Sequence, residues 1–167
     1  AMVHNRTGAE IIDMTKQDYA ITDDDLTKME GVIKIKEVDT IELSTLVAGV
    51  ISLQEWHYDA VCLVSVASPM PDLAVKWMMQ ILYASTMEEL EDPPQFRSLG
   101  TKLPVGVMKI MPPDLVRQVK VVRQQYLMQR QIPLSGRQML WMLYQSLRLS
   151  DRDDIMEIFD LHKIEVN

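Results

Sequence analysis

Apolar residues recur at helical spacing over most of the chain, and the clearest case is the segment 113–131. Its apolar residues follow the spacing i, i+4, i+7 and i+11, as Leu115, Val119, Val122 and Tyr126. Since successive helical residues are turned by about 100°, these side chains form one stripe along the helix. The pattern predicts a helix that packs against a core through this stripe and turns its polar residues elsewhere.

Capping residues and prolines mark where further helices begin and end. Thr22 precedes three aspartates and suits a helix start, and Pro71 suits a first helical turn. The spacing of a capping box occurs at Asp39 with Glu42, at Ser135 with Gln138 and at Ser150 with Asp153. Together with the apolar periodicity, these signals predict helices over residues 22–30, 40–54, 56–67, 72–90, 113–131, 136–149 and 151–162.

Two short runs are typical of β-strands instead. Residues 32–36 partly alternate and are rich in β-branched side chains, and residues 105–111 form a second such run. The sequence therefore predicts a mainly α protein, a single-domain bundle of six to seven helices with at most a small two-stranded β element. We expect this domain to cover residues 22–167, preceded by a flexible N-terminal arm over residues 1–21, where no periodicity is visible.

The predicted helix 136–149 is apolar nearly all round, and only a narrow polar edge interrupts it. Such a helix is either the central core helix or part of a subunit interface, because exposing it in a monomer is costly. The candidate interface residues are Met139, Trp141, Met142 and Tyr144. The chain also holds 13 methionines, which suit irregular cores and equally suit a groove that adapts to partners.

The net charge of −7 conceals three segments of different sign. Residues 1–93 carry 6 basic and 17 acidic side chains, residues 94–149 carry 9 and 1, and residues 150–167 carry 2 and 6. The basic segment indicates an anionic partner, unless the chain's own acidic ends or a neighbouring subunit neutralise it. Its candidate anion-binding residues are Arg97, Lys102, Arg117, Lys120, Arg123, Arg130 and Arg137.

The sequence holds no motif for catalysis, metal binding or cofactor binding. The three histidines lie far apart, the single cysteine has no partner, and the glycines are isolated. Cys62 lies in an apolar run and is interpreted as core packing. His57 lies between Glu55 and Asp59, a combination that suits acid–base chemistry. Neighbouring helix positions face apart, however, so His57 would need partners from elsewhere in the fold.

These observations favour a non-enzymatic, self-associating assembly protein with a basic helical face for RNA or an anionic membrane surface. Viral matrix and nucleocapsid proteins share this general physical character, an analogy that rests on no motif. Two alternatives stay open: an adaptor that binds proteins through Met-rich apolar surfaces, and an enzyme that uses His57. An intracellular location is expected, because a lone cysteine suits a reducing compartment and no signal-peptide pattern or membrane-length apolar run is found.

Overall fold

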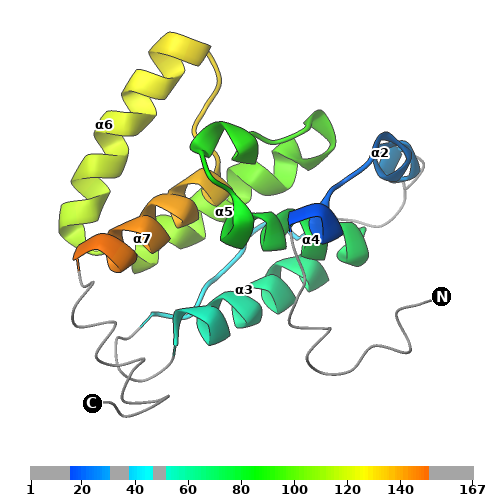
Figure 1. The fold of residues 1–167 in the computed structure, drawn as a ribbon, viewed down its shortest axis with the longest axis horizontal. Helices are drawn as coiled ribbons and strands as arrows, with labels where there is room; N and C mark the ends of the chain where they lie inside the picture. The colour runs from blue at the N-terminus through cyan, green and yellow to red at the C-terminus, as the bar shows by residue number, and fades with distance from the viewer. Residues whose placement is uncertain (1–15, 31–37, 47–51, 151–167) are drawn as a thin grey trace.

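The computed structural model describes residues 16–30, 38–46 and 52–150, and this part of the chain folds into an all-helical bundle (Figure 1). Its α-helices are α2 (Asp23–Glu30), α3 (Leu53–Ala67), α4 (Pro71–Tyr83), α5 (Arg97–Ile110), α6 (Pro113–Arg130) and α7 (Gly136–Ser150). Short 3-10 helices occur at η2 (Lys16–Tyr19), η3 (Met87–Leu90) and η4 (Pro94–Phe96). The described residues contain no strand, and the predicted mainly α, single-domain bundle is confirmed.

The helix boundaries follow from local capping. At α2, the Thr22 hydroxyl accepts from the Asp25 backbone N–H at 3.1 Å, and the Asp25 carboxylate accepts from the Thr22 N–H at 3.1 Å. Ser135 and Gln138 make the same reciprocal pair at the start of α7. These two predicted caps, and the helices 113–131 and 136–149, are therefore confirmed to within one residue at each end.

The core forms where α4, α5 and α7 pack together, with α3 lying along α4. The Trp77 ring of α4 stacks on Phe96 with their centroids 5.1 Å apart. Leu99, Leu103 and Val107 line one face of α5 and are fully buried. Each such side chain contributes about 1.5–3 kcal/mol on burial, so this cluster is a large share of the stabilising free energy.

Two predicted elements are wrong. Residues 105–111 are not a strand, because all but the last belong to α5, where the buried stripe of Leu99, Leu103 and Val107 prevails over Pro104 and Gly106. Residues 40–46 are not helical. Instead they run along the bundle, where Ile41 is buried and the Ser44 carbonyl accepts a hydrogen bond from the Trp56 indole at 2.8 Å.

Smaller corrections concern α3 and α4. The helix predicted from residue 56 already begins at Leu53, because Ser52 caps it through the Glu55 backbone N–H. The helix predicted over 72–90 ends at Tyr83, and the chain restarts as η3, where the Glu89 carboxylate accepts from the Thr86 N–H at 3.2 Å. Cys62 is exposed rather than part of the core.

Several predictions lie outside the described residues. These are the strand over 32–36, the helix over 151–162 and residues 1–15 of the predicted arm. The rest of that arm, residues 16–21, is described: η2 packs on α4, and the Tyr19 and Tyr83 rings stack with their centroids 5.5 Å apart.

Gly106 marks the place where residues 38–46 pass closest to α5. A Cβ added at Gly106 would lie 2.5 Å from the Ile41 backbone oxygen. Glycine to alanine in a helix ordinarily stabilises by about 0.5–1 kcal/mol, but here the new methyl group meets a backbone atom that has little room to move.

We therefore expect Gly106→Ala to destabilise the protein by roughly 1–3 kcal/mol, measured as the free energy of unfolding in urea. Val105→Ala, at the neighbouring and exposed position, serves as the control and should change stability by less than about 0.5 kcal/mol. An increase in stability for Gly106→Ala would show that this close approach does not exist in solution.

Candidate functional site

The helix α6 is the most exposed of the long helices, and it carries four of the seven predicted anion-binding residues. Only Leu115, Val119 and Tyr126 of its 18 residues are buried, as the predicted stripe requires. In Figure 1 it stands at the upper left, against α7, with its outer side free of other described elements. Any function of α6 in binding therefore belongs to this outer side.

The cations of α6 do not form one continuous strip of free charge. Arg117 pairs with Asp114 one turn earlier, and the Arg130 Nε lies 2.5 Å from a carboxylate oxygen of Glu91. Lys120 and Arg123 are exposed and have no ion-pair partner among the residues that the structure describes. The free positive charge of this helix is thus concentrated in two side chains.

Arg137 is not part of any basic surface, and its prediction as an anion-binding residue is wrong. Its side chain is 1% exposed, and its Nε lies 3.0 Å from an Asp92 carboxylate oxygen. The remaining guanidinium nitrogens donate to the Trp77 carbonyl at 3.0 Å, to the Gln80 side-chain oxygen at 2.6 Å and to the Glu91 carbonyl at 3.1 Å. Arg137 therefore fastens α7 to α4 and to the loop before η4.

The Asp92 carboxylate makes a further contact besides its pair with Arg137. It accepts a second hydrogen bond from the Trp77 indole at 3.0 Å. Burial raises the pKa of Asp92, while the adjacent Arg137 guanidinium and the Trp77 hydrogen bond oppose that rise. Both charges of the pair are buried and hydrogen-bonded to each other and to neighbouring groups, so Arg137 is occupied inside the fold and does not present its charge to a ligand.

Arg97 and Lys102, the remaining predicted anion-binding residues, lie on α5 and not on α6. Arg97 is exposed, and its positive charge is one of the smaller influences that oppose the rise in the pKa of Asp92 caused by burial. Lys102 is half-buried and already interacts within the chain. Neither extends the free charge of Lys120 and Arg123 into a larger basic surface.

A second polar cluster anchors the C-terminal half of α6. The Tyr126 hydroxyl donates to the Glu91 carboxylate, and it accepts from the Gln138 amide at 2.8 Å. Burial, followed by the hydrogen bond to Glu91, raises the pKa of Tyr126 to about 12. Burial also pushes the pKa of Glu91 upward, but the hydrogen bonds from Tyr126 and Arg130 outweigh it and the pKa is lowered. This cluster fixes how α6 projects from the bundle.

His57, the candidate acid–base residue, has no exposed surface. Its Nδ1 lies 2.6 Å from the Tyr144 hydroxyl and its Nε2 lies 3.1 Å from the Met78 carbonyl. Because a carbonyl only accepts, Nε2 carries the proton and Nδ1 accepts from Tyr144. Both nitrogens are therefore occupied inside the core, and Glu55 and Asp59 lie on the exposed side of α3. A substrate cannot reach His57 in this structure.

The candidate interface residues of α7 are divided between core and surface. Met139 and Tyr144 are buried within the same molecule, so their prediction as interface residues is corrected. Trp141 and Met142 are half-buried, and the Trp141 indole donates to the Ala84 carbonyl at 3.1 Å. Of the two interpretations of this helix, the structure supports the central core helix.

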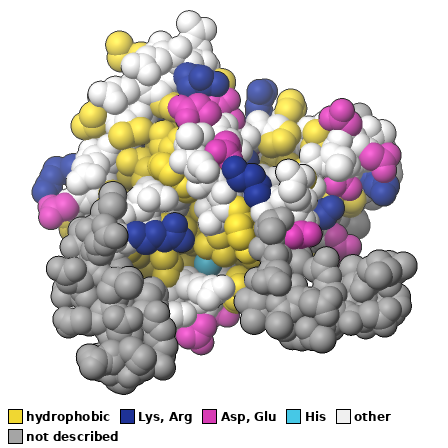
Figure 2. Space-filling model, in the orientation of Figure 1, with side chains coloured by type: hydrophobic (Ala, Val, Ile, Leu, Met, Phe, Trp, Pro, Cys, Tyr) yellow, Lys and Arg dark blue, Asp and Glu magenta, His cyan; other side chains and the backbone are white. Residues whose placement is uncertain are grey.

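Exposed apolar side chains gather instead on α6 and α3. On α6 they are Val121, Leu127 and Met128, the last of which is 80% exposed. On α3 they are Tyr58, Leu63 and Val66, with Cys62 beside them, and Val66 is 77% exposed. Figure 2 shows hydrophobic side chains over and beside α6 on the face in view. The α3 surface was not predicted because the run from 60 to 67 is apolar except at Ser65, so the sequence pattern does not separate a buried side of the helix from an exposed one.

Comparisons with protein-family models, with curated proteins and with solved structures found no match.

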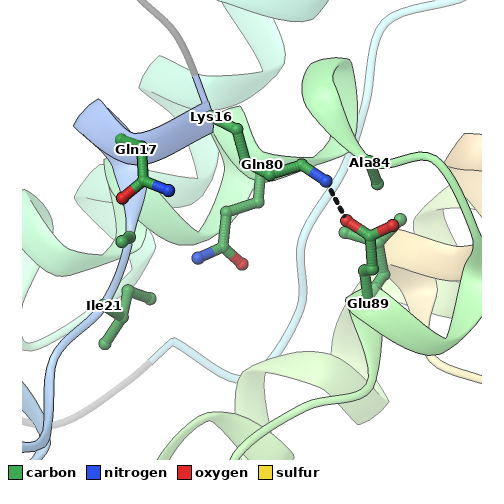
Figure 3. Close-up of a pocket in the computed structure, with 8 residues that line it drawn as sticks. Lys16, Gln17, Ile21, Gln80, Ala84 and Glu89 are labelled. Atoms are coloured by element: carbon green, nitrogen blue, oxygen red, sulfur yellow. Dashed lines mark hydrogen bonds and ion pairs between the residues drawn. The ribbon is translucent and has the colours of Figure 1, made fainter.

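A shallow pocket of about 290 Å³ lies between η2, α4 and η3 (Figure 3). The Lys16 Nζ and a Glu89 carboxylate oxygen meet across it at 2.5 Å. Gln80 donates to the Tyr19 carbonyl at 3.0 Å and accepts from Arg137. Lys16 and Glu89 are thus paired with each other, and Gln80 is paired with groups outside the pocket, which leaves little for a ligand to bind.

The described residues offer neither a metal site nor a membrane span. Within them, no three His, Cys, Asp or Glu side chains lie close enough together to hold a metal ion. Likewise, none of the described helices combines the length and the apolar character needed to cross a bilayer. The exposed surface of α6 thus remains the best candidate site.

Proposed function

We propose that this chain is a non-enzymatic assembly protein that binds protein surfaces, copies of itself included, through the exposed side of α6. The observation that carries the proposal is the exposure of Val121, Leu127 and Met128 on one helix. A monomeric protein gains nothing from holding such large apolar side chains in water, and clusters of them commonly mark interaction sites.

The distribution of charge on α6 favours a protein partner over RNA. Binding along a phosphate backbone draws its strength from many free Lys and Arg side chains. On α6, two of the four cations already face carboxylates, and apolar and glutamine side chains fill the spaces between them. A surface of exposed Met and Arg with few acidic residues is closer to the composition of protein–protein interfaces.

The double substitution Val121→Glu and Met128→Glu tests this proposal. We expect it to weaken concentration-dependent association at least tenfold, measured as mass by light scattering over a dilution series. Losing the burial of one large apolar side chain accounts for about 1.5–3 kcal/mol, and 1.4 kcal/mol corresponds to tenfold in affinity.

Gln118→Glu with Gln129→Glu is the matched control, because it adds the same charge to exposed positions on another side of the same helix. The control should associate as the unaltered protein does. If the unaltered protein is a monomer at every concentration, or if Val121→Glu with Met128→Glu associates normally, the proposal is wrong.

The anion-binding alternative rests on Lys120 and Arg123, which have no ion-pair partner among the described residues. It gives a different outcome in the same experiment. Mass would then rise only when generic RNA is added, would fall again with salt, and would respond to charge reversal at Lys120 and Arg123 rather than to the apolar substitutions.

A further inference from the structure

The outward side of α6 carries a regular stripe opposite its buried one. Arg117, Val121, Gln124 and Met128 follow the spacing i, i+4, i+7 and i+11, and all four are exposed. This spacing keeps side chains on one line of a helix and suits packing against a second helix. The helix as a whole carries four cations and the single acid Asp114. Its outward side therefore combines the apolar side chains Val121 and Met128 with polar ones in a positive setting.

The outward side of α3 carries a stripe of the same spacing and the opposite charge. Its members are Glu55, Asp59, Cys62 and Val66, and all four are exposed. Two carboxylates lie on this helix, which contains no Lys or Arg. Tyr58 and Leu63 flank the stripe with further exposed apolar surface. This side therefore combines two carboxylates with the apolar surface of Cys62 and Val66, and its setting is negative.

The two stripes match in register when the helices run parallel. Glu55 precedes Val66 by the same number of residues by which Arg117 precedes Met128. Glu55 therefore lies opposite Arg117, which also pairs with Asp114 of its own helix, and the most exposed apolar side chains lie opposite each other. In the same register Asp59 lies opposite Val121, the neighbour in sequence of Lys120, which has no ion-pair partner in the described part of the chain. Two copies of α6 facing each other would instead bring like charges together, and so would two copies of α3.

We infer that α6 of one copy docks on α3 of a second copy, so that the chain assembles head to tail. The inference rests on the proposed function and names the partner surface. Figure 1 places α3 at the foot of the molecule and α6 at its upper left, so one molecule can use both surfaces at once. A contact between two different surfaces repeats from copy to copy and produces a ring or a filament rather than a closed dimer.

Two variants test the surfaces of α6 and α3 one at a time. One is Val121→Glu with Met128→Glu on α6, and the other is Asp59→Lys with Val66→Lys on α3. Each variant retains one intact surface, and thermal melting serves as the control that each variant remains folded. Alone, each variant is expected to remain a monomer at concentrations where the unaltered protein associates. Asp72→Lys with Ser85→Lys changes the charge by the same amount at exposed positions on and beside α4, and this control should associate normally.

Mixing the two variants is the decisive measurement. The intact α3 of one meets the intact α6 of the other, so an equimolar mixture should form a dimer and nothing larger, seen as twice the monomer mass by light scattering. If the α6 variant is a monomer but the α3 variant associates normally, or if mixing restores nothing, head-to-tail docking is wrong while α6 remains the interface. Normal association of the α6 variant would instead overturn the proposed function itself.

Discussion

Replacing Arg137 by methionine is expected to destabilise the protein by about 3–5 kcal/mol, the cost of removing one partner from a buried ion pair. Methionine fills similar space but leaves the Asp92 carboxylate in the interior without its cation. It also removes the hydrogen bonds that Arg137 donates to the Trp77 and Glu91 carbonyls. Because the total stability of a domain is only about 5–15 kcal/mol, this loss shifts the urea midpoint strongly.

The comparison with Arg123→Met gives the prediction its control. Arg123 is exposed and has no ion-pair partner in the described part of the chain, so its replacement should stay within about 0.5 kcal/mol. Arg137→Lys should fall between the two, since an ammonium keeps the charge but cannot donate in the directions of the planar guanidinium. Equal stabilities for Arg123→Met and Arg137→Met would contradict the buried pair.

A double-mutant cycle with Asp92→Asn isolates the pair itself. Asparagine still accepts from the Trp77 indole but carries no charge. If the two side chains interact directly, the double variant Asp92→Asn with Arg137→Met should lose less stability than the sum of the two single losses. If the losses of stability in the two single variants instead add up to the loss in the double variant, the destabilisation by Arg137→Met comes from the other hydrogen bonds of Arg137.

The ion pair between Arg137 and Asp92 could not be predicted from the sequence. The helices α6 and α7 were predictable because their apolar periodicity, and in α7 also the capping pair Ser135–Gln138, are signals that lie within a few residues of one another. The partner of Arg137 is Asp92, which lies 45 residues away in the sequence, and no local sequence pattern indicates this contact. The available signal was an arginine on the narrow polar edge of an apolar helix, and it was interpreted as surface charge.

The candidate site was predictable to a similar degree. The exposure of α6 follows from its narrow apolar stripe, and the pairing of Arg117 with Asp114 follows from their spacing. The pairing of Arg130 with Glu91 depends on the tertiary fold, which is why the basic surface was predicted larger than it is. For α5, Pro104 and Gly106 concealed a helical stripe that only packing against α7 stabilises.

Lowering the pH from 7 to 4 is expected to reduce the stability by roughly 3 kcal/mol through His57 alone. Burial, opposed by the hydrogen bond to Met78, lowers the pKa of His57 from 6.5 to about 4. Between these values the unfolded chain binds a proton that the folded protein excludes. The stability associated with neutral His57 is thus complete above pH 6.5 and is lost as the pH falls toward 4.

This pH range separates the titration of His57 from that of the carboxylates whose pKa values are lowered. Glu89 and Asp25 also have lowered pKa values, but their stabilising contributions are lost only as the pH falls below about 4.5, the ordinary range of carboxyl groups. Asp92, whose pKa is raised by burial, contributes with the opposite sign as the pH falls, so the contribution of His57 is the difference in slope of the unfolding free energy between the unaltered protein and His57→Gln from pH 4.5 to 6.5. In His57→Gln this slope should flatten, whatever the stability of that variant at pH 7.

Tyr144→Phe distinguishes the cause of the shift. It removes the donor to Nδ1 and should lower stability at pH 7 by about 1–3 kcal/mol, because a buried acceptor loses its partner. It should leave the slope between pH 4.5 and 6.5 in place, since burial and not the tyrosine hydroxyl is the main reason that His57 stays neutral. Direct titration of the His57 ring by NMR completes the test. A folded-state pKa near 6.5 would show that water reaches this side chain, and the buried arrangement with Tyr144 and Met78 would then be incorrect.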